Sequence, residues 1–151
     1  MFDLNFKIEN IENIFGVQDS FLLYLIADLI KNNDVFYVAD NDIELFKIND
    51  FILNNFPEIN IFLFPSWDCL PYDVSSPNFN ILSDRIKAFS DLSSLENALK
   101  KKNLYLTTVN GILIKTAPKD FYKSNFLKIT KTKVHSFKSI FNFLLNIGYN
   151  R

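Results

Sequence analysis

The residues that could carry chemistry gather in one segment, residues 64–85, which reads "FPSWDCLPYDVSSPNFNILSDR". Its side chains Asp68, Asp73, Asp84 and Arg85 could form a polar cluster at the end of an apolar run. General acid–base or nucleophilic catalysis needs a positioned base, most often a histidine. The segment contains no histidine and no glycine-rich stretch. We therefore interpret these charged residues as structural, with no catalytic residues expected.

The two residue types that most often bind metals each occur once. Cys69 has no cysteine or histidine partner at metal-ligand spacing, and His135 lies alone in a lysine-rich stretch. We expect a semi-buried thiol at Cys69 and a surface or capping role for His135. The sequence therefore predicts no metal site and no cofactor.

The stretch "GVQDSFLL", residues 16–23, begins with a glycine ahead of a predicted helix, as a phosphate-binding loop does. That loop has the pattern G-x-x-x-x-G-K-[ST], in which backbone N–H groups and the lysine hold phosphate and the hydroxyl holds Mg²⁺. Only Gly16 matches, because Phe21, Leu22 and Leu23 replace the second glycine, the lysine and the hydroxyl. Asp19 adds negative charge where phosphate would lie. We interpret the stretch as an ordinary capped helix start with no nucleotide-binding function.

The elements that must position these residues follow from hydrophobic periodicity. Residues 35–39, 59–64 and 103–109 are short apolar runs typical of strands buried on both faces. Helices are predicted over 19–31, 42–55, 78–92 and 110–115, the first capped by Asp19 or Ser20 and the last by Asn110. This alternation predicts an α/β fold with an open, mostly parallel sheet flanked by helices.

Spacing also predicts which side chains face the core. In the helix over 42–55 we expect inward positions for Ile43, Phe46 and Phe51, and in the helix over 78–92 for Ile81, Leu82, Ile86 and Phe89. In the 64–85 segment, Trp67, Leu70, Tyr72 and Phe79 are expected to bury their apolar surfaces, while Pro65, Pro71 and Pro77 stiffen the backbone.

The pattern changes after Pro118. Residues 121–134 alternate in the manner of a strand with one wet face, and residues 136–149 form an amphipathic pattern ending near Gly148. A strand and a helix alone bury their apolar surface poorly. We expect residues 121–151 to begin a second, small α+β domain whose remainder is missing.

Composition limits the function classes. With 48% hydrophobic residues, 17 of the 151 being Phe, the chain is too apolar for a disordered protein. No apolar run approaches the length of a membrane span, no signal peptide is present, and one cysteine is typical of the reducing cytoplasm.

The charge is unevenly distributed. Residues 1–99 carry a net charge of −11 and residues 100–151 one of +10. The basic part suggests an acidic protein surface or nucleic acid as partner. Two alternatives are that the halves attract each other and that the lysines form a solvated face.

The 64–85 segment also resembles a family motif. It closely resembles the N-terminal segment of the bacterial transcription-repair coupling factor, Mfd, with the form W-[DE]-x-L-P-Y-[DE]-x-x-S-P…I-x-x-R-[LI]. The matching residues are Trp67, Asp68, Leu70, Pro71, Tyr72, Asp73, Ser76, Pro77, Ile81 and Arg85. The stretch "TTVNGILIKTAPKDFY" resembles the family's next segment, and "LLNIGYNR", ending at Arg151, resembles its L-x-x-x-G-Y-x-R.

This resemblance implies a UvrB-like module that has lost its nucleotide-binding residues. It implies a degenerate helicase-type domain over residues 1–120 and the truncated start of a UvrA-interaction domain over 121–151. The implied partner is UvrA, with Lys128, Lys131, Lys133 and Arg151 as candidate contacts. The family's ATP-driven DNA translocase and its RNA polymerase and DNA contacts lie in absent downstream domains, so this chain is expected to have no ATPase activity.

Two other functions stay open from the residues alone. One is a P-loop ATPase with a divergent site, against which Leu22 argues. The other is a small standalone module that binds nucleic acid through the basic end, with Lys128, Lys131 and Lys133 as contacts.

Overall fold

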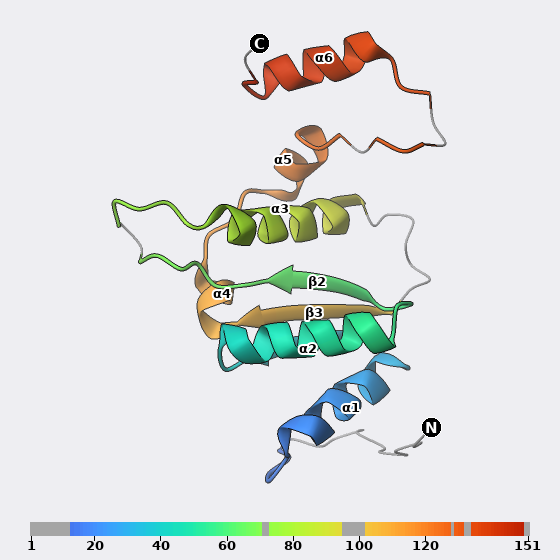
Figure 1. The fold of residues 1–151 in the computed structure, drawn as a ribbon, viewed down its shortest axis with the longest axis vertical. Helices are drawn as coiled ribbons and strands as arrows, with labels where there is room; N and C mark the ends of the chain where they lie inside the picture. Colours follow the sequence, from blue (N-terminus) through green and yellow to red (C-terminus); the bar gives the residue numbers. More distant parts are fainter. Residues whose placement is uncertain (1–12, 71–72, 95–101, 128, 132–133, 150–151) are drawn as a thin grey trace.

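The computed structural model describes residues 13–70, 73–94, 102–127, 129–131 and 134–149. Three parallel strands form one sheet in the order β1 (Val35–Ala39), β3 (Asn103–Thr108), β2 (Asn60–Phe64). Val35 and Ile61 both pair with Leu104, so the central strand β3 is in register with both neighbours. The helices α1 (Asp19–Ile30), α2 (Asp42–Asn55) and α3 (Phe79–Ser94) lie on its two sides (Figure 1). The predicted open parallel α/β sheet is confirmed.

The first face of the sheet is covered by α1 and α2. Strand residues Leu104 and Leu106 are fully buried there, because alternate residues of a strand point to the same face. They form one cluster with buried residues of both helices and of β1: Leu23, Ile26, Ala27, Ile30, Ala39, Leu45, Ile48 and Ile52. This cluster is the main core of the molecule.

The predicted inward residues of α2 are partly wrong. Ile43 is 83% exposed and Phe46 is also exposed, while Phe51 packs against the edge of the core. Asn41 is the N-cap, and the helix phase that follows from it turns Leu45, Ile48 and Ile52 toward the sheet. Those three residues have the i, i+3, i+7 spacing of one helix face.

The second face is covered only in part. Phe62 and Phe64 of β2 pack with Ala88, Phe89 and Leu92 of α3. On the same face, β1 leaves Phe36 61% exposed and Val38 exposed, so the prediction that residues 35–39 are buried on both faces is wrong. The reason is topology, because β1 is an edge strand and α3 lies over β2 at the opposite edge.

Orientation within α3 also differs from the expectation at one residue. Ile81, Leu82 and Phe89 are half-buried, but Ile86 is exposed. Instead, Arg85, Ala88 and Ser90 are the buried positions in this part of the helix. The side that faces the sheet is therefore more polar than its hydrophobic spacing predicted.

The segment between β2 and α3 is not packed in the way predicted. Trp67, Leu70 and Phe79 are exposed, Leu70 by 76%, while Pro71 and Tyr72 lie outside the described residues. The connection is fixed by hydrogen bonds instead. The carboxylate of Asp42 accepts from the backbone N–H of Ser66 at 3.1 Å, and that of Asp68 accepts from the N–H of Asn78 at 2.9 Å.

Helix starts differ from the predicted caps in two places. Gln18, not Asp19 or Ser20, is the N-cap of α1 and makes no side-chain capping bond. Thr108, not Asn110, caps α4 (Val109–Leu113) through a bond from the N–H of Gly111. α1 begins at the predicted residue 19, whereas α4 begins one residue earlier than predicted.

The chain after Pro118 contains a helix where a strand was predicted. Residues 119–124 form α5 (Lys119–Ser124), whose Tyr122 ring stacks on Phe89 of α3. A strand there would need a neighbour to satisfy its backbone hydrogen bonds, whereas a helix satisfies its own. The predicted strand over 121–134 is therefore wrong for the described residues, while the predicted last helix exists as α6 (Phe137–Asn146).

Gly148 ends α6 as predicted. It has a φ of +92°, and the N–H groups of Gly148 and Tyr149 donate to the carbonyls of Leu145 and Leu144. This is the Schellman arrangement, which favours glycine at the left-handed position. Among the described residues, none of the helices has the length and apolar character needed to cross a bilayer.

Candidate functional site

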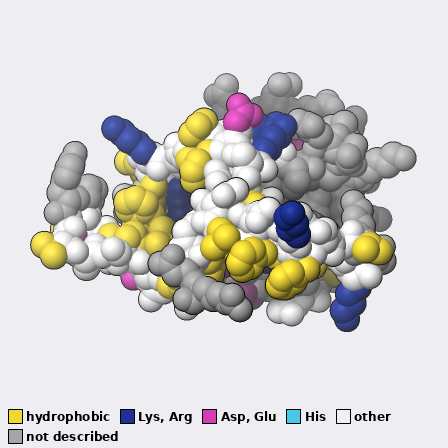
Figure 2. All heavy atoms as spheres, turned by 90° about the horizontal axis from the view of Figure 1, so that it is seen from above, with side chains coloured by type: hydrophobic (Ala, Val, Ile, Leu, Met, Phe, Trp, Pro, Cys, Tyr) yellow, Lys and Arg dark blue, Asp and Glu magenta, His cyan; other side chains and the backbone are white. Residues whose placement is uncertain are grey.

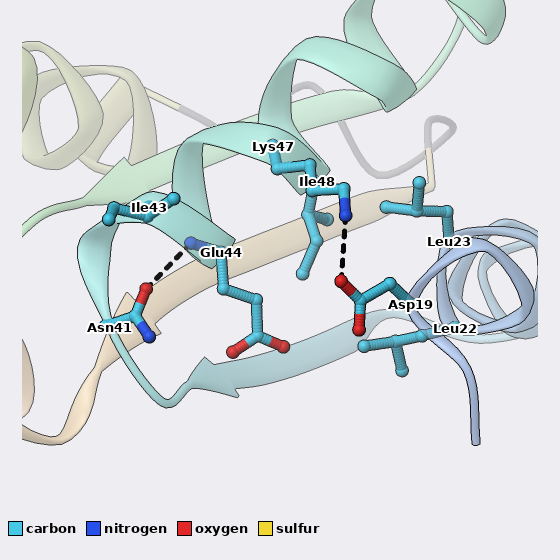
Figure 3. A pocket seen from close by; sticks show the side chains of 8 residues that line it. All are labelled: Asp19, Leu22, Leu23, Asn41, Ile43, Glu44, Lys47 and Ile48. Atoms are coloured by element: carbon cyan, nitrogen blue, oxygen red, sulfur yellow. Dashed lines mark hydrogen bonds and ion pairs between the residues drawn. The ribbon is translucent and has the colours of Figure 1, made fainter.

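The start of α1 lies beside the first turn of α2, and the two line a cavity of about 260 Å³ (Figure 3). Gly16 precedes it with a φ of +72°. The carboxylate of Asp19 accepts a hydrogen bond from the Lys47 ammonium at 2.9 Å across this cavity. The position that a phosphate would occupy in a nucleotide-binding loop therefore faces a carboxylate that already holds the neighbouring cation.

The charges around this cavity do not favour the binding of an anionic ligand, because carboxylates of the protein already lie there. The bond and charge of Lys47 lower the pKa of the Asp19 carboxyl group, so it stays ionised. Glu44 adds a second carboxylate, which accepts from the Tyr37 hydroxyl at 2.5 Å and from the Asp40 N–H at 2.9 Å. Burial and this contact with Glu44 raise the pKa of Tyr37.

The two leucines that replace the lysine and the hydroxyl lie on the core side of this cavity. Leu23 is buried in the main core, and Leu22 is half-buried against it. Both side chains line the cavity as apolar wall (Figure 3). The site can therefore supply neither the ammonium nor the magnesium-binding hydroxyl at these two positions.

A second set of polar contacts joins the carboxyl ends of β2 and β3. The Ser66 and Thr108 hydroxyls lie 2.5 Å apart, and the Thr107 hydroxyl donates to the Phe64 carbonyl at 3.1 Å. A Cβ atom at Gly111 would lie 2.7 Å from both the Phe64 carbonyl oxygen and the Thr107 hydroxyl oxygen. Only glycine lets α4 approach the strands this closely.

Arg85 completes this junction. It is only 5% exposed, and its guanidinium donates to the carbonyls of Pro65 at 2.8 Å and Gly111 at 3.2 Å. Its central carbon lies 5.8 Å from the centre of the Phe89 ring. Burial lowers the pKa of the guanidinium. Arg85 thus ties α3 to the end of β2 and to α4.

The other residues of the predicted motif do not gather around Arg85. Trp67 and Leu70 line a cavity of about 580 Å³ together with Cys69 and residues 110 and 113–115. The Asp73 carboxylate accepts from the Val74 N–H at 2.7 Å, Ser76 is exposed and Pro77 is half-buried. The motif is therefore spread along the connection and forms no single cluster of side chains.

The predicted basic contacts are mostly outside the described residues. Lys128, Lys133 and Arg151 fall there, while Lys131 is exposed. His135 caps no described helix: it is half-buried, and its Nε2 atom accepts from the N–H of Thr130, a loop residue, at 3.3 Å. Cys69 is partly exposed, in agreement with a semi-buried thiol. In the described ranges, no group of three side chains is arranged to hold a metal ion.

Several residues that build these two places are not predicted by the local sequence patterns. Lys47 and Glu44 come from α2 and Tyr37 from β1. The pairing of Lys47 with Asp19 depends on how α1 and α2 pack beside each other on one face of the sheet. Thr108 had a local signal, since a Thr three residues before a helical N–H is a preferred N-cap. Thr108 also lies inside the strand predicted over residues 103–109, and its strand pattern conceals the capping signal.

The fold places the chain in the class of α/β domains with an open parallel sheet. Comparison with known proteins narrows this class. The chain is 34% identical over 130 residues to a transcription-repair-coupling factor of Rickettsia bellii, which is 85% of this chain and 11% of that protein. It is 35% identical over 74% of its length to the corresponding factor of Rickettsia typhi, and 34% identical over 53% to that of Haemophilus influenzae.

The resemblance expected from the sequence is thereby confirmed: the chain is similar to one segment of the transcription-repair coupling factors. The matched region spans about a tenth of the length of the Rickettsia relatives. No protein-family model matches the chain, and no solved structure matches it.

Proposed function

We propose that the chain is a non-catalytic, UvrB-like module of a transcription-repair coupling factor that serves the recruitment of UvrA in the cytoplasm. The observation that carries this proposal is the similarity to coupling factors over 85% of the chain. The cavity at the start of α1 supports the non-catalytic part, because Asp19 and Glu44 face it and Lys47 is already paired. In this proposal the ATP-driven translocase and the contacts with RNA polymerase and DNA belong to parts of the relatives that this chain does not match.

We also propose the domain division expected from the sequence, with residues 1–120 as a degenerate helicase-type domain and 121–151 as the start of a UvrA-interaction domain. The sheet and its helices α1–α4 all fall in the first range. The helix α5 spans the boundary and packs against α3, and α6 falls in the second range. Limited proteolysis checks this division: the first stable product should end near residue 120 or retain α5, and cleavage inside the sheet would contradict it.

Titration calorimetry with ATP and Mg²⁺ tests the absence of nucleotide binding. We expect no heat of binding, because a triphosphate would meet ionised carboxylates and no unpaired lysine at this helix start. Micromolar, magnesium-dependent binding would overturn the non-catalytic part of the proposal. The variant Asp19→Asn with Leu22→Lys is a useful comparison, since it removes one carboxylate and adds the missing ammonium.

Surface plasmon resonance with immobilised UvrA tests the adaptor part. The chain should bind UvrA, and substitution of Lys131 by Glu should weaken that binding if the basic end forms the contact. A matched control is Lys87→Glu, an exposed lysine on α3. Binding that neither substitution changes would place the UvrA contact elsewhere on the chain, and no binding would contradict the adaptor role of this chain.

A second candidate function is supported by the net charge of +10 over residues 100–151. In this alternative, the basic end binds nucleic acid without sequence preference through Lys128, Lys131 and Lys133. Affinity for random duplex DNA should then fall steeply as salt rises, because each contact with a phosphate releases counterions. Fluorescence anisotropy with labelled DNA checks this, and negligible affinity at low salt eliminates it.

A further inference from the structure

The second face of the sheet carries a cavity of about 340 Å³, which extends from the Arg85 junction toward the exposed edge at β1. Its floor consists of side chains from all three strands, and α3 and α4 form its sides. The residues that matter for the argument are Phe36, Tyr105, Phe89, Ile112 and Arg85. We call it the Arg85 pocket.

Apolar surface continues from the Arg85 pocket across the uncovered edge of the sheet. Phe36 is 61% exposed there, Val38 lies beside it on the same strand face, and Ile112 is exposed on α4. Parallel sheets are normally covered by helices on both faces. On this face α3 packs on β2 and leaves β1 open. The open area is thus apolar strand surface of the kind that a helix normally covers in a parallel sheet.

The charge in this pocket is not balanced by the described part of the chain. Arg85 is buried. Among the described residues, its guanidinium donates to the two neutral carbonyls of Pro65 and Gly111 and lies over the Phe89 ring, with no carboxylate among these partners. Burying a cation without a counter-charge is costly, whereas a carboxylate can form two parallel, charge-assisted hydrogen bonds with a guanidinium. A ligand with an apolar face and one carboxylate would complement both features.

We propose that the Arg85 pocket is the docking site of an amphipathic protein helix. Its apolar face packs on Phe36, Tyr105 and Ile112, and one Asp or Glu side chain reaches Arg85. A protein helix fits better than nucleic acid, because the walls are apolar and aromatic. It fits better than a free small acid, because the exposed apolar surface extends beyond the pocket along β1. This inference is independent of the proposed function.

The test uses the full chain and a library of displayed amphipathic helices of about 18 residues, long enough to cross the sheet. Their apolar positions are kept and their other positions are randomised. We expect selection to enrich helices that carry one Asp or Glu at the border of the apolar face. Replacing that residue by Asn or Gln in the purified peptide should weaken binding about tenfold or more, as expected for a lost charge-assisted hydrogen bond. Fluorescence anisotropy measures this difference.

Variants of the chain locate the binding. Phe36→Asp on the exposed edge strand should abolish binding, whereas Leu53→Asp, equally exposed on α2 over the opposite face, should not. Arg85→Gln should remove the preference for the acidic peptide, and Lys87→Gln, an exposed cation on the same helix, should keep it. Circular dichroism verifies that each variant is folded. If Arg85→Gln does not fold, the comparison of Phe36→Asp with Leu53→Asp decides the test.

Three results would overturn the proposal. The first is a selection that yields no binding helix, or helices without an acidic residue. The second is equal binding to Phe36→Asp and to the unchanged chain. The third is binding of 4-phenylbutyrate as tight as that of the selected peptides, which would assign the pocket to a free carboxylic acid instead of a helix.

Discussion

At the scale of the residue, the junction of β2, β3 and α4 depends on Gly111, which has no side chain. Gly111 lies against the Phe64 carbonyl and the Thr107 hydroxyl, and the Arg85 guanidinium donates to the carbonyl of Gly111. The backbone cannot easily move away, because Thr107 and Ser66 tie the same strands together. Packing and hydrogen bonding at this point therefore reinforce each other.

Replacing Gly111 by Ala tests this junction. The added methyl group would meet a backbone oxygen at 2.7 Å, and we expect the free energy of unfolding to fall by about 1–3 kcal/mol, as in other overpacked sites. Urea unfolding followed by circular dichroism measures it. Asn110→Ala is the control, since Asn110 is an exposed neighbour on the same helix. Equal effects of the two substitutions would contradict the close approach.

Tyr37 gives a prediction about alkaline pH. Its pKa is raised above the ordinary value of 10.0, first by burial and then by Glu44, so the folded state keeps the proton after the unfolded state has lost it. Above pH 10 the unfolded chain binds fewer protons, and stability therefore falls as the pH rises. Between about pH 8 and about pH 11 the free energy of unfolding should decrease less for Tyr37→Phe than for the unchanged chain. Equal losses would show that the proton on Tyr37 is not linked to folding.

At the scale of the element, the helix starts differ in how well they are capped. The Asn41 side chain accepts from the Glu44 N–H at 3.0 Å at the start of α2, while Gln18 makes no such bond at the start of α1. The cap on α2 also places Glu44 next to Tyr37 and Asp40. The first turn of α2 is thus a better defined structure than the first turn of α1.

Two matched substitutions test this difference. Asn41→Ala should lower the free energy of unfolding by about 1 kcal/mol, because a backbone N–H loses its partner. Gln18→Ala should have an effect of at most a few tenths of a kcal/mol, since the side chain it removes forms no cap. Urea unfolding of both variants measures the values. A larger loss for Gln18→Ala would contradict the assigned caps.

Element orientation is also where local patterns failed. Ile43, Phe46 and Ile86 have helical spacing but are exposed, whereas Arg85 is buried. Hydrophobic spacing predicts that a helix has a face but does not state how that face is turned toward a sheet. That rotation also depends on the strand against which the helix packs, and for α2 the central strand β3 is far away in sequence.

At the scale of the whole molecule, the described residues leave apolar surface open on two elements in particular. One such surface lies over β1, and the other follows α6, where Phe137 is 80% exposed and Leu145 is also exposed. Viewed from the α6 end, hydrophobic side chains lie at the surface together with Lys and Arg side chains (Figure 2). At about 25 cal/mol per Å², burial of a few hundred Å² would yield several kcal/mol. Such surface favours association.

Self-association through α6 is therefore expected. Sedimentation velocity at micromolar concentration should detect species larger than a monomer, and Phe137→Ser combined with Leu145→Ser should reduce their share, because the exposed apolar area decreases. Leu53→Ser is the control, as it removes an exposed leucine from α2, away from α6. A chain that stays monomeric, or a control that has the same effect, would contradict the role of α6.

The sequence by itself determined the elements before Pro118, their order and the relationship of the chain to coupling factors. Strands at 35–39, 60–64 and 103–108 are short apolar runs, and the residues around Trp67 and Arg85 form a motif, so both signals are local. Only the tertiary structure decided that β1 is an edge strand, that Lys47 pairs with Asp19, and that Arg85 is buried beside an open apolar pocket. These features depend on contacts between residues far apart in the chain, and no local pattern encodes which surfaces such contacts leave uncovered.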